Sequence, residues 1–122
     1  EVYSLKKGDP IRIAMNENFD VTQISKYIPD SNGFYSTPRH SSSFIAGGRV
    51  IRNDRKNGKI IVKYNLSGGY YAISYTNESV AYLYDFKDDD YRKVDFPEVM
   101  PGDTVVARMS YFTANEMVVL RK

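Results

Sequence analysis

Residues 49–64 read RVIRNDRKNGKIIVKY, and this stretch indicates how the whole chain folds. Two β-branched runs flank a polar segment, NDRKNG, whose composition is typical of a turn between antiparallel strands. In the second run Ile60 and Val62 alternate with Lys59 and Lys63, so successive side chains point to an apolar face and to a charged face. The stretch therefore predicts a β-hairpin with one buried face and one face in water.

Runs of the same kind occur on both sides of this hairpin. Further strands are expected at Ile11–Met15, Phe19–Ile24, Phe44–Arg52, Tyr70–Tyr75, Val80–Tyr84, Thr104–Ser110 and Glu116–Leu120. The composition agrees, because 20 Val and Ile residues stand against four Leu, and the 11 Tyr residues also suit pleated sheets. The sequence predicts a single all-β domain over residues 1–122. We expect a small barrel or sandwich of about eight mainly antiparallel strands, OB-like or related.

Two segments interrupt the strand pattern. Pro29–Ser43 is rich in Pro, Ser, Asn, Gly and Thr, and we expect a long loop there, held down by Phe34 and Tyr35. Asp85–Pro101 begins with an acidic run and then carries apolar residues that fit either a brief strand or a single helical turn. Both segments are expected at the surface, where loops commonly meet partners.

The composition also excludes several classes of site. The chain has no cysteine, which rules out disulfides and thiolate-bound zinc or iron–sulfur clusters. Its formal net charge of +2 is too small to indicate nucleic acid by itself, and no apolar run reaches the roughly 18 residues of a membrane-spanning helix. We expect no cofactor. Because the chain starts at Glu1, we expect a processed product or a part of a longer exported protein.

A short pattern occurs twice, as GDPIRIAM at residues 8–15 and as GDTVVARM at residues 102–109. In each copy a Gly-Asp pair precedes an alternating apolar run that leads into a hairpin. Glycine supplies the backbone conformation of a turn, and aspartate accepts hydrogen bonds from nearby amides, so structure alone explains the pair. Whether the two copies share an origin stays open.

Several stretches together resemble the β-rich modules of Gram-positive cell-surface proteins that accompany S-layer homology domains. They are LKKGDPIRI (5–13), GGRVI (47–51), VAYLYD (80–85), MPGDTVVAR (100–108) and MVVL (117–120). The resemblance covers most of the chain apart from Pro29–Ser43. It implies a non-catalytic structural or interaction module outside the cytoplasm, with cell-wall or other surface-protein components as partners. This sequence contains no helical S-layer homology repeat, so anchoring would reside elsewhere.

A second class of function is a ligand-binding barrel. Six side chains form the candidate ligand site: Arg49, Arg52, Lys59, Lys63, Tyr70 and Tyr82. Cations on a hairpin with nearby aromatic rings suit single-stranded nucleic acid, and exposed tyrosines alone suit a glycan. Lysine and arginine on a hairpin ordinarily serve solubility and edge protection, which makes nucleic acid the less favoured partner.

The acidic run offers a candidate cation site at Asp85, Asp88 and Asp90, because closely spaced carboxylates are the ligands that calcium prefers. The alternation, central glycine and distal glutamate of an EF-hand are missing, so a solvated loop is the favoured interpretation. The only histidine, His40, adjoins serines, but no nucleophile turn or oxyanion hole accompanies it. We therefore expect that the chain is not an enzyme.

Overall fold

The computed structural model describes residues 5–31, 33–36, 43–64 and 69–122, and within them the fold is all-β, as predicted. The strands are β1 (Ile11–Met15), β2 (Val21–Lys26), β3 (Tyr35–Ser36), β4 (Ser43–Asp54), β5 (Lys59–Lys63), β6 (Tyr70–Ser74), β7 (Val80–Asp85), β8 (Asp90–Val94), β9 (Thr104–Ser110) and β10 (Thr113–Arg121). One 3₁₀ turn, η1, covers Phe96–Glu98. None of these described segments is a helix with the length and apolarity needed to cross a membrane.

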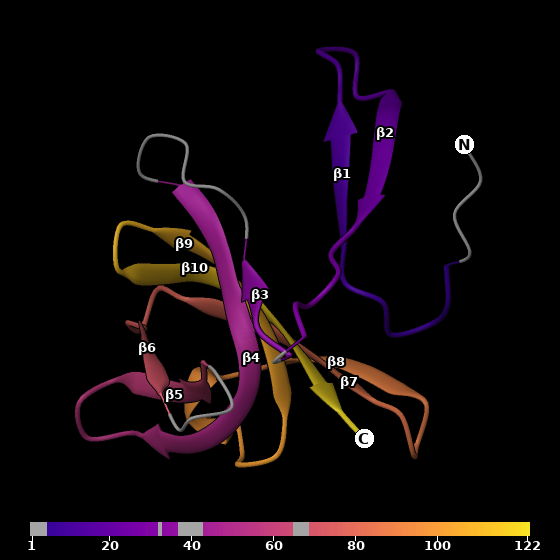
Figure 1. Cartoon of the computed structure of the whole chain (residues 1–122). Coiled ribbons are helices and arrows are strands. Elements are labelled where there is room, and N and C mark those ends of the chain that lie inside the picture. Colours follow the sequence, from indigo (N-terminus) through magenta and orange to yellow (C-terminus); the bar gives the residue numbers. More distant parts are fainter. Residues whose placement is uncertain (1–4, 32, 37–42, 65–68) are drawn as a thin grey trace.

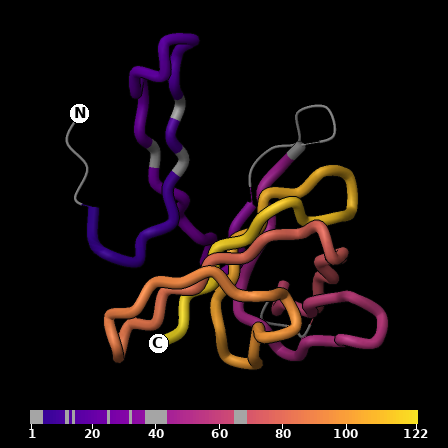
Figure 2. The backbone as a smooth tube through the Cα atoms, turned by 180° about the vertical axis from the view of Figure 1, so that it is seen from behind, coloured from indigo at the N-terminus to yellow at the C-terminus, as the bar shows by residue number. Residues whose placement is uncertain are grey.

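Five strands form a closed ring in the order β4, β5, β6, β10 and β9, and β9 returns to pair with β4 (Figures 1 and 2). Most pairs are antiparallel, as predicted. The exceptions involve β10, which runs parallel to β6 at Thr113 and parallel to β7 from Glu116 to Arg121. The β7–β8 hairpin extends this sheet beyond the ring, and β3 adds a short edge strand to β4.

The ring encloses one apolar core. Its largest side chains that expose 1% or less of their surface come from all five ring strands, from β7 and from the segment between η1 and β9: Val50, Ile60, Val62, Ile73, Leu83, Val99, Val105, Met109, Met117 and Val119. Phe34 packs edge-on against Tyr71 at the start of β6, and Phe96 packs against Tyr75 just beyond its end. These two rings therefore close the opposite ends of the core.

The two irregular segments contain more structure than the sequence indicated. Within the expected loop Pro29–Ser43, the chain forms β3 and already enters β4 at Ser43, while positions 32 and 37–42 lie outside the described residues. The loop prediction was too broad because β3 is only two residues long and is held by pairing with Ala46 and Gly47. Within Asp85–Pro101, the apolar part contains the single helical turn η1, and a strand, β8, forms before it at Asp90–Val94, where an irregular segment was expected.

The two Gly-Asp pairs form the same turn. In the first, the Asp9 N–H donates to the Lys6 carbonyl (3.0 Å), and the Lys6 N–H donates to the Asp9 carboxylate (2.8 Å). In the second, Asp103 and Met100 exchange the same two bonds at 3.1 and 2.9 Å. Both glycines have φ +93°, which favours glycine. A hairpin follows each turn, β1–β2 after the first and β9–β10 after the second.

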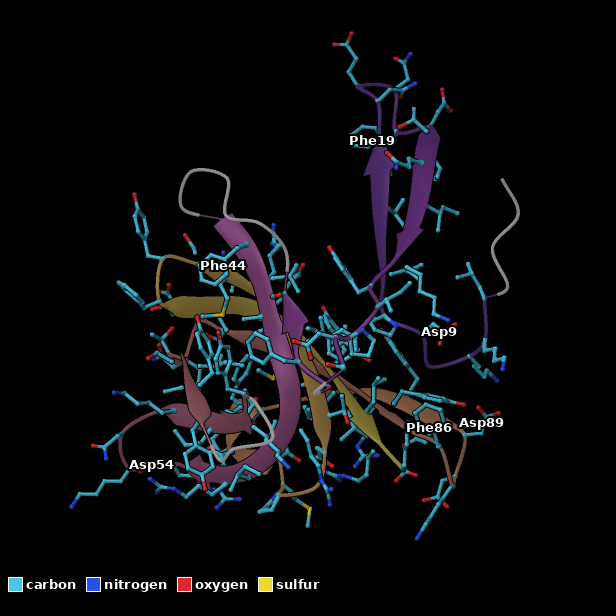
Figure 3. The ribbon with its side chains drawn as sticks, in the orientation of Figure 1. Asp9, Phe19, Phe44, Asp54, Phe86 and Asp89 are labelled. Atoms are coloured by element: carbon cyan, nitrogen blue, oxygen red, sulfur yellow. The ribbon has the colours of Figure 1, made fainter. Side chains whose placement is uncertain are left out.

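The two hairpins have different surroundings. The β9–β10 hairpin forms part of the barrel wall, whereas the β1–β2 hairpin pairs only with itself among the described residues and projects away from the barrel (Figures 1 and 2). Its base is held to the β7–β8 hairpin, because Gly8 lies directly against the Phe86 ring. Figure 3 shows Asp9 beside Phe86 and Asp89, with Phe19 at the far tip.

Candidate functional site

The outer face of β4 carries two of the predicted cations, Arg49 and Arg52, and a β-bulge between them brings Arg52 to that face. Val50 is buried and lies opposite Val62, so Arg49 points outward. Simple alternation would place Arg52 on the same side as Val50. The register shifts at Ile51, however, and Arg52 lies opposite Ile61 on the outer face. A bulge of this kind inserts one residue and re-aims the side chains that follow it.

The next two strands extend this face. In β5 the buried Ile60 and Val62 alternate with Lys59 and Lys63, which confirms the predicted two-faced strand. Tyr70 lies directly opposite Lys63 in the β5–β6 pair and exposes 63% of its surface. We call the surface formed by Arg49, Arg52, Lys59, Lys63 and Tyr70 the cationic face. Five of the six predicted ligand residues therefore lie on one side of three neighbouring strands.

The charges of the cationic face are available to a ligand. Among the ion pairs of the described residues, none includes Arg49, Arg52, Lys59 or Lys63. The carboxylate at its edge is Asp54, which receives the Asn57 side-chain amide at 2.9 Å. That bond, together with the charges of Arg52 and Lys59, holds the pKa of the Asp54 carboxyl below its ordinary value. One ionised carboxylate thus accompanies four cations.

Tyr82 does not belong to this face. It lies on β7 and stacks on Tyr91 of β8, with ring centroids 6.4 Å apart and planes 8° from parallel. Tyr82 lies opposite Lys93 of β8. Among the described residues β7 pairs only with β10 and β8, so Tyr82 lies away from β4 and β5. The two tyrosines of the candidate ligand site, Tyr70 and Tyr82, therefore lie on different parts of the sheet.

Two of the three predicted calcium ligands, Asp85 and Asp90, make separate contacts. Asp85 accepts the backbone N–H groups of Lys87 and Asp88 in the β7–β8 turn. Asp90 forms an ion pair with Arg92 at 2.7 Å. Within the part of the chain that the structure describes, no three acidic or histidine side chains gather closely enough to hold a metal ion. His40 lies outside the described residues.

The remaining aspartate of this turn, Asp89, has a role that the sequence did not reveal. Its carboxylate accepts the Tyr84 hydroxyl at 2.7 Å and pairs with Lys7 at 3.0 Å. These contacts hold the N-terminal turn on the β7–β8 hairpin, and we call them the latch. Lys7 is 82 positions away in the chain, so no local pattern links the two residues.

The latch is expected to open at both ends of the pH scale. The Tyr84 hydroxyl, and then Lys7, hold the pKa of Asp89 below its ordinary 3.8, while the hydrogen bond to Asp89 raises the pKa of Lys7 above 10.5. A lowered carboxyl pKa stabilises the latch above pH 3.8, and this is lost as the pH falls through the lowered value. A raised lysine pKa stabilises it below pH 10.5, and this is lost as the pH rises through the raised value.

NMR signals of the Phe86 and Tyr84 rings, followed as the pH is changed from acid to alkaline, measure the opening of the latch. In the Asp89→Asn variant, the acid transition of these two rings should disappear while the amide spectrum of the barrel stays unchanged. An unaltered acid transition in that variant would show that another group controls the contact.

Comparison with known proteins adds no assignment for these surfaces: no family model, no curated protein and no solved structure matches the chain.

Proposed function

We propose that this chain is a non-catalytic adhesive module of an exported surface protein and that its cationic face binds a phosphodiester polymer. The observation that carries the proposal is the gathering of Tyr70 and four cations, which form no ion pair among the described residues, on one side of β4, β5 and β6. The extracytoplasmic setting rests on the resemblance to Gram-positive surface modules. The binding chemistry rests on the face itself.

The layout of the face suits a linear polyanion. Lys59 and Lys63 lie four residues apart along β5, roughly 13 Å. Arg52 lies opposite Ile61, between them, on the neighbouring strand. Cations spaced in this way meet successive phosphates of an extended chain, and binding gains free energy from released counterions. Tyr70, beside Lys63, offers a flat ring for stacking on a base or sugar.

Two sources share this phosphodiester chemistry, a poly(glycerol phosphate) of the cell wall and a single-stranded nucleic acid. The chain is titrated with each of them and with a neutral wall glycan, and amide shifts are followed by NMR. Amide shifts at 49–63 and at Tyr70 with either phosphate polymer support the proposal. The polymer that binds with the lower Kd is then the favoured ligand. Shifts confined to Tyr82 and Tyr91 with the neutral glycan would contradict it.

Binding is expected to weaken steeply with salt. If four phosphates are neutralised, affinity should fall about 50-fold between 50 and 200 mM salt, from the counterion slope for single strands. Isothermal titration at three salt concentrations measures the slope. An affinity that does not depend on salt would contradict a phosphodiester ligand.

Charge reversal locates the contact. Arg52→Glu/Lys59→Glu should lower affinity at least about tenfold, because it replaces two attractive charges by two repulsive ones. Lys87→Glu/Lys93→Glu, on the β7–β8 hairpin, changes the net charge equally and should alter affinity about twofold or less. Equal losses in the two variants would mean that net charge alone governs binding.

A further inference from the structure

The centre of the cationic face is apolar. On β5, Ile61 lies between Lys59 and Lys63 on the outer side of the strand and is only half-buried. On β6, the exposed Ala72 lies directly opposite Ile61. We call Ile61 and Ala72 the apolar floor. It lies in the middle of a surface whose other members are charged or aromatic.

The register of the three strands leaves an open position over this floor. Arg52 lies opposite Ile61 on β4, so Arg52, Ile61 and Ala72 form one row across the sheet. Along β6, Tyr70 and Ser74 lie on either side of Ala72, each roughly 7 Å away on the same face. Because Ala72 carries only a methyl group, the position beside the Tyr70 ring is open to a planar group.

Tyr70 is a free stacking surface. On the side away from β5, β6 pairs with β10 only at Ser74, so among the described residues no paired strand adjoins Tyr70 or Ala72 there. None of the ring contacts within the described part of the chain includes Tyr70. Six other tyrosines each pack against a second ring: Tyr64, Tyr71, Tyr75, Tyr82, Tyr84 and Tyr91.

The cations of β5 do not protect a sheet edge. Lysines often keep an exposed edge strand from pairing with another chain. Here β5 pairs with β4 over Lys59–Val62 and with β6 along its whole length. Solubility alone explains the charges, but it does not explain an apolar floor and an uncovered ring among them.

The two phosphodiester polymers differ in what lies between their phosphates. A nucleotide carries a planar base with a π face, whereas a glycerol unit carries no ring. Aromatic side chains stack on every kind of base, and a nearby arginine adds a cation–π contribution. Over the floor a base buries apolar surface, while the hydroxyl groups of a glycerol unit lose hydrogen bonds to water. The floor and the Tyr70 ring therefore favour a base.

We propose that Tyr70 and the apolar floor form a stacking subsite for one base, and that the cationic face prefers single-stranded nucleic acid for this reason. The inference rests on the proposed function, since the four cations must hold the phosphates on either side of the base. Tyr70 is then a specificity-determining residue, because it adds affinity only for a polymer that carries bases.

Three probes with the same phosphodiester chemistry test this subsite on the full chain: a thymidine oligonucleotide, an abasic oligonucleotide of equal length and poly(glycerol phosphate). Isothermal titration at one low salt concentration should give the thymidine probe at least about tenfold higher affinity than the other two, the effect of one stacked base.

The outcomes separate this inference from the proposed function. Equal affinities for thymidine and abasic probes, with amide shifts at 49–63, would overturn the base subsite and leave phosphodiester binding in place. Tighter binding of poly(glycerol phosphate) would overturn it too. Absence of binding by all three probes would contradict the proposed function itself, and the subsite with it.

Variants at Tyr70 locate the subsite. Tyr70→Ala should lower affinity for the thymidine probe at least about tenfold and leave affinity for the abasic probe unchanged, whereas Tyr70→Phe keeps the ring and should keep the preference. Tyr91→Ala is the matched control, because Tyr91 on β8 exposes 65% of its surface against 63% for Tyr70. It should change neither affinity. Equal losses for both probes in Tyr70→Ala would show that the ring does not contact a base.

A variant of the floor provides the last test. Ala72→Ile introduces a residue that strands accept readily but fills the position beside Tyr70. It should weaken the thymidine probe severalfold and leave the abasic probe unaffected. Circular dichroism of each variant checks that the fold is retained. Unchanged binding of the thymidine probe in Ala72→Ile would show that the base does not lie over the floor.

Discussion

Replacement of Gly47 by alanine is expected to destabilise the barrel by about 3 kcal/mol or more, because it forces two paired strands apart. Gly47 lies in β4 opposite Val106 of β9. A β-carbon at this position would overlap the Val105 carbonyl oxygen and lie 2.8 Å from the Val106 Cα. Both obstacles are backbone atoms of a paired strand, so no side-chain rotation relieves the clash.

The neighbouring glycine is the matched control. At Gly48 the nearest atoms to an added β-carbon are the Lys63 carbonyl oxygen at 3.0 Å and the Phe34 ring at 3.5 Å, and a small shift accommodates them. Gly48→Ala should therefore cost about 1 kcal/mol. Urea unfolding followed by circular dichroism measures both variants. Equal losses of stability in the two variants would mean that the backbone clash at Gly47 does not determine the effect of the substitution.

Replacement of Asp103 by alanine is expected to cost about 3 kcal/mol, because it leaves a partly buried arginine without its anion. Asp103 is the one polar side chain that the described residues bury, and it exposes 3% of its surface. Its two oxygens receive the Arg121 Nε–H and a terminal N–H, both at 2.9 Å. One of them also accepts the Met100 N–H, so three bonds are lost together.

The first Gly-Asp turn provides an internal control for this prediction. Asp9→Ala removes the equivalent amide bond and the Lys26 pair, but both groups are in contact with water. An exposed pair contributes little, so the melting temperature should change much less than in Asp103→Ala. If the two variants lose equal stability, burial is not what makes Asp103 important.

The strand pattern of this chain follows from local chemistry. In β5 and in β9, apolar residues at every second position are buried, Ile60 and Val62 in β5 and Val105, Ala107 and Met109 in β9, and this alternation predicts both strands correctly. The Gly-Asp turns are equally local, because two hydrogen bonds within four residues define them. Both features depend on residues that are close together in the sequence, so they can be predicted from the sequence alone.

The cationic face was predictable only in part. The sequence identifies Lys59 and Lys63 as outward-facing because they alternate with buried residues. It also offers Arg52 as a ligand residue by its charge, although simple alternation from the buried Val50 would turn Arg52 inward. Only the bulge at Ile51 brings Arg52 outward, and a bulge arises from how two strands pair rather than from the composition of one.

Whether a hairpin is buried or exposed was decided by the tertiary structure alone. GDPIRIAM and GDTVVARM form the same turn and begin similar strands, yet β9 and β10 close the barrel while β1 and β2 project from it. The latch between Lys7 and Asp89 likewise joins residues 82 positions apart. By itself, the sequence determined turns, alternation and strand faces, which short-range sterics and burial preference control. Which strands pair, and which hairpin face is buried, depended on contacts between segments that are distant in the sequence. The free energy of such contacts cannot be derived from either segment alone.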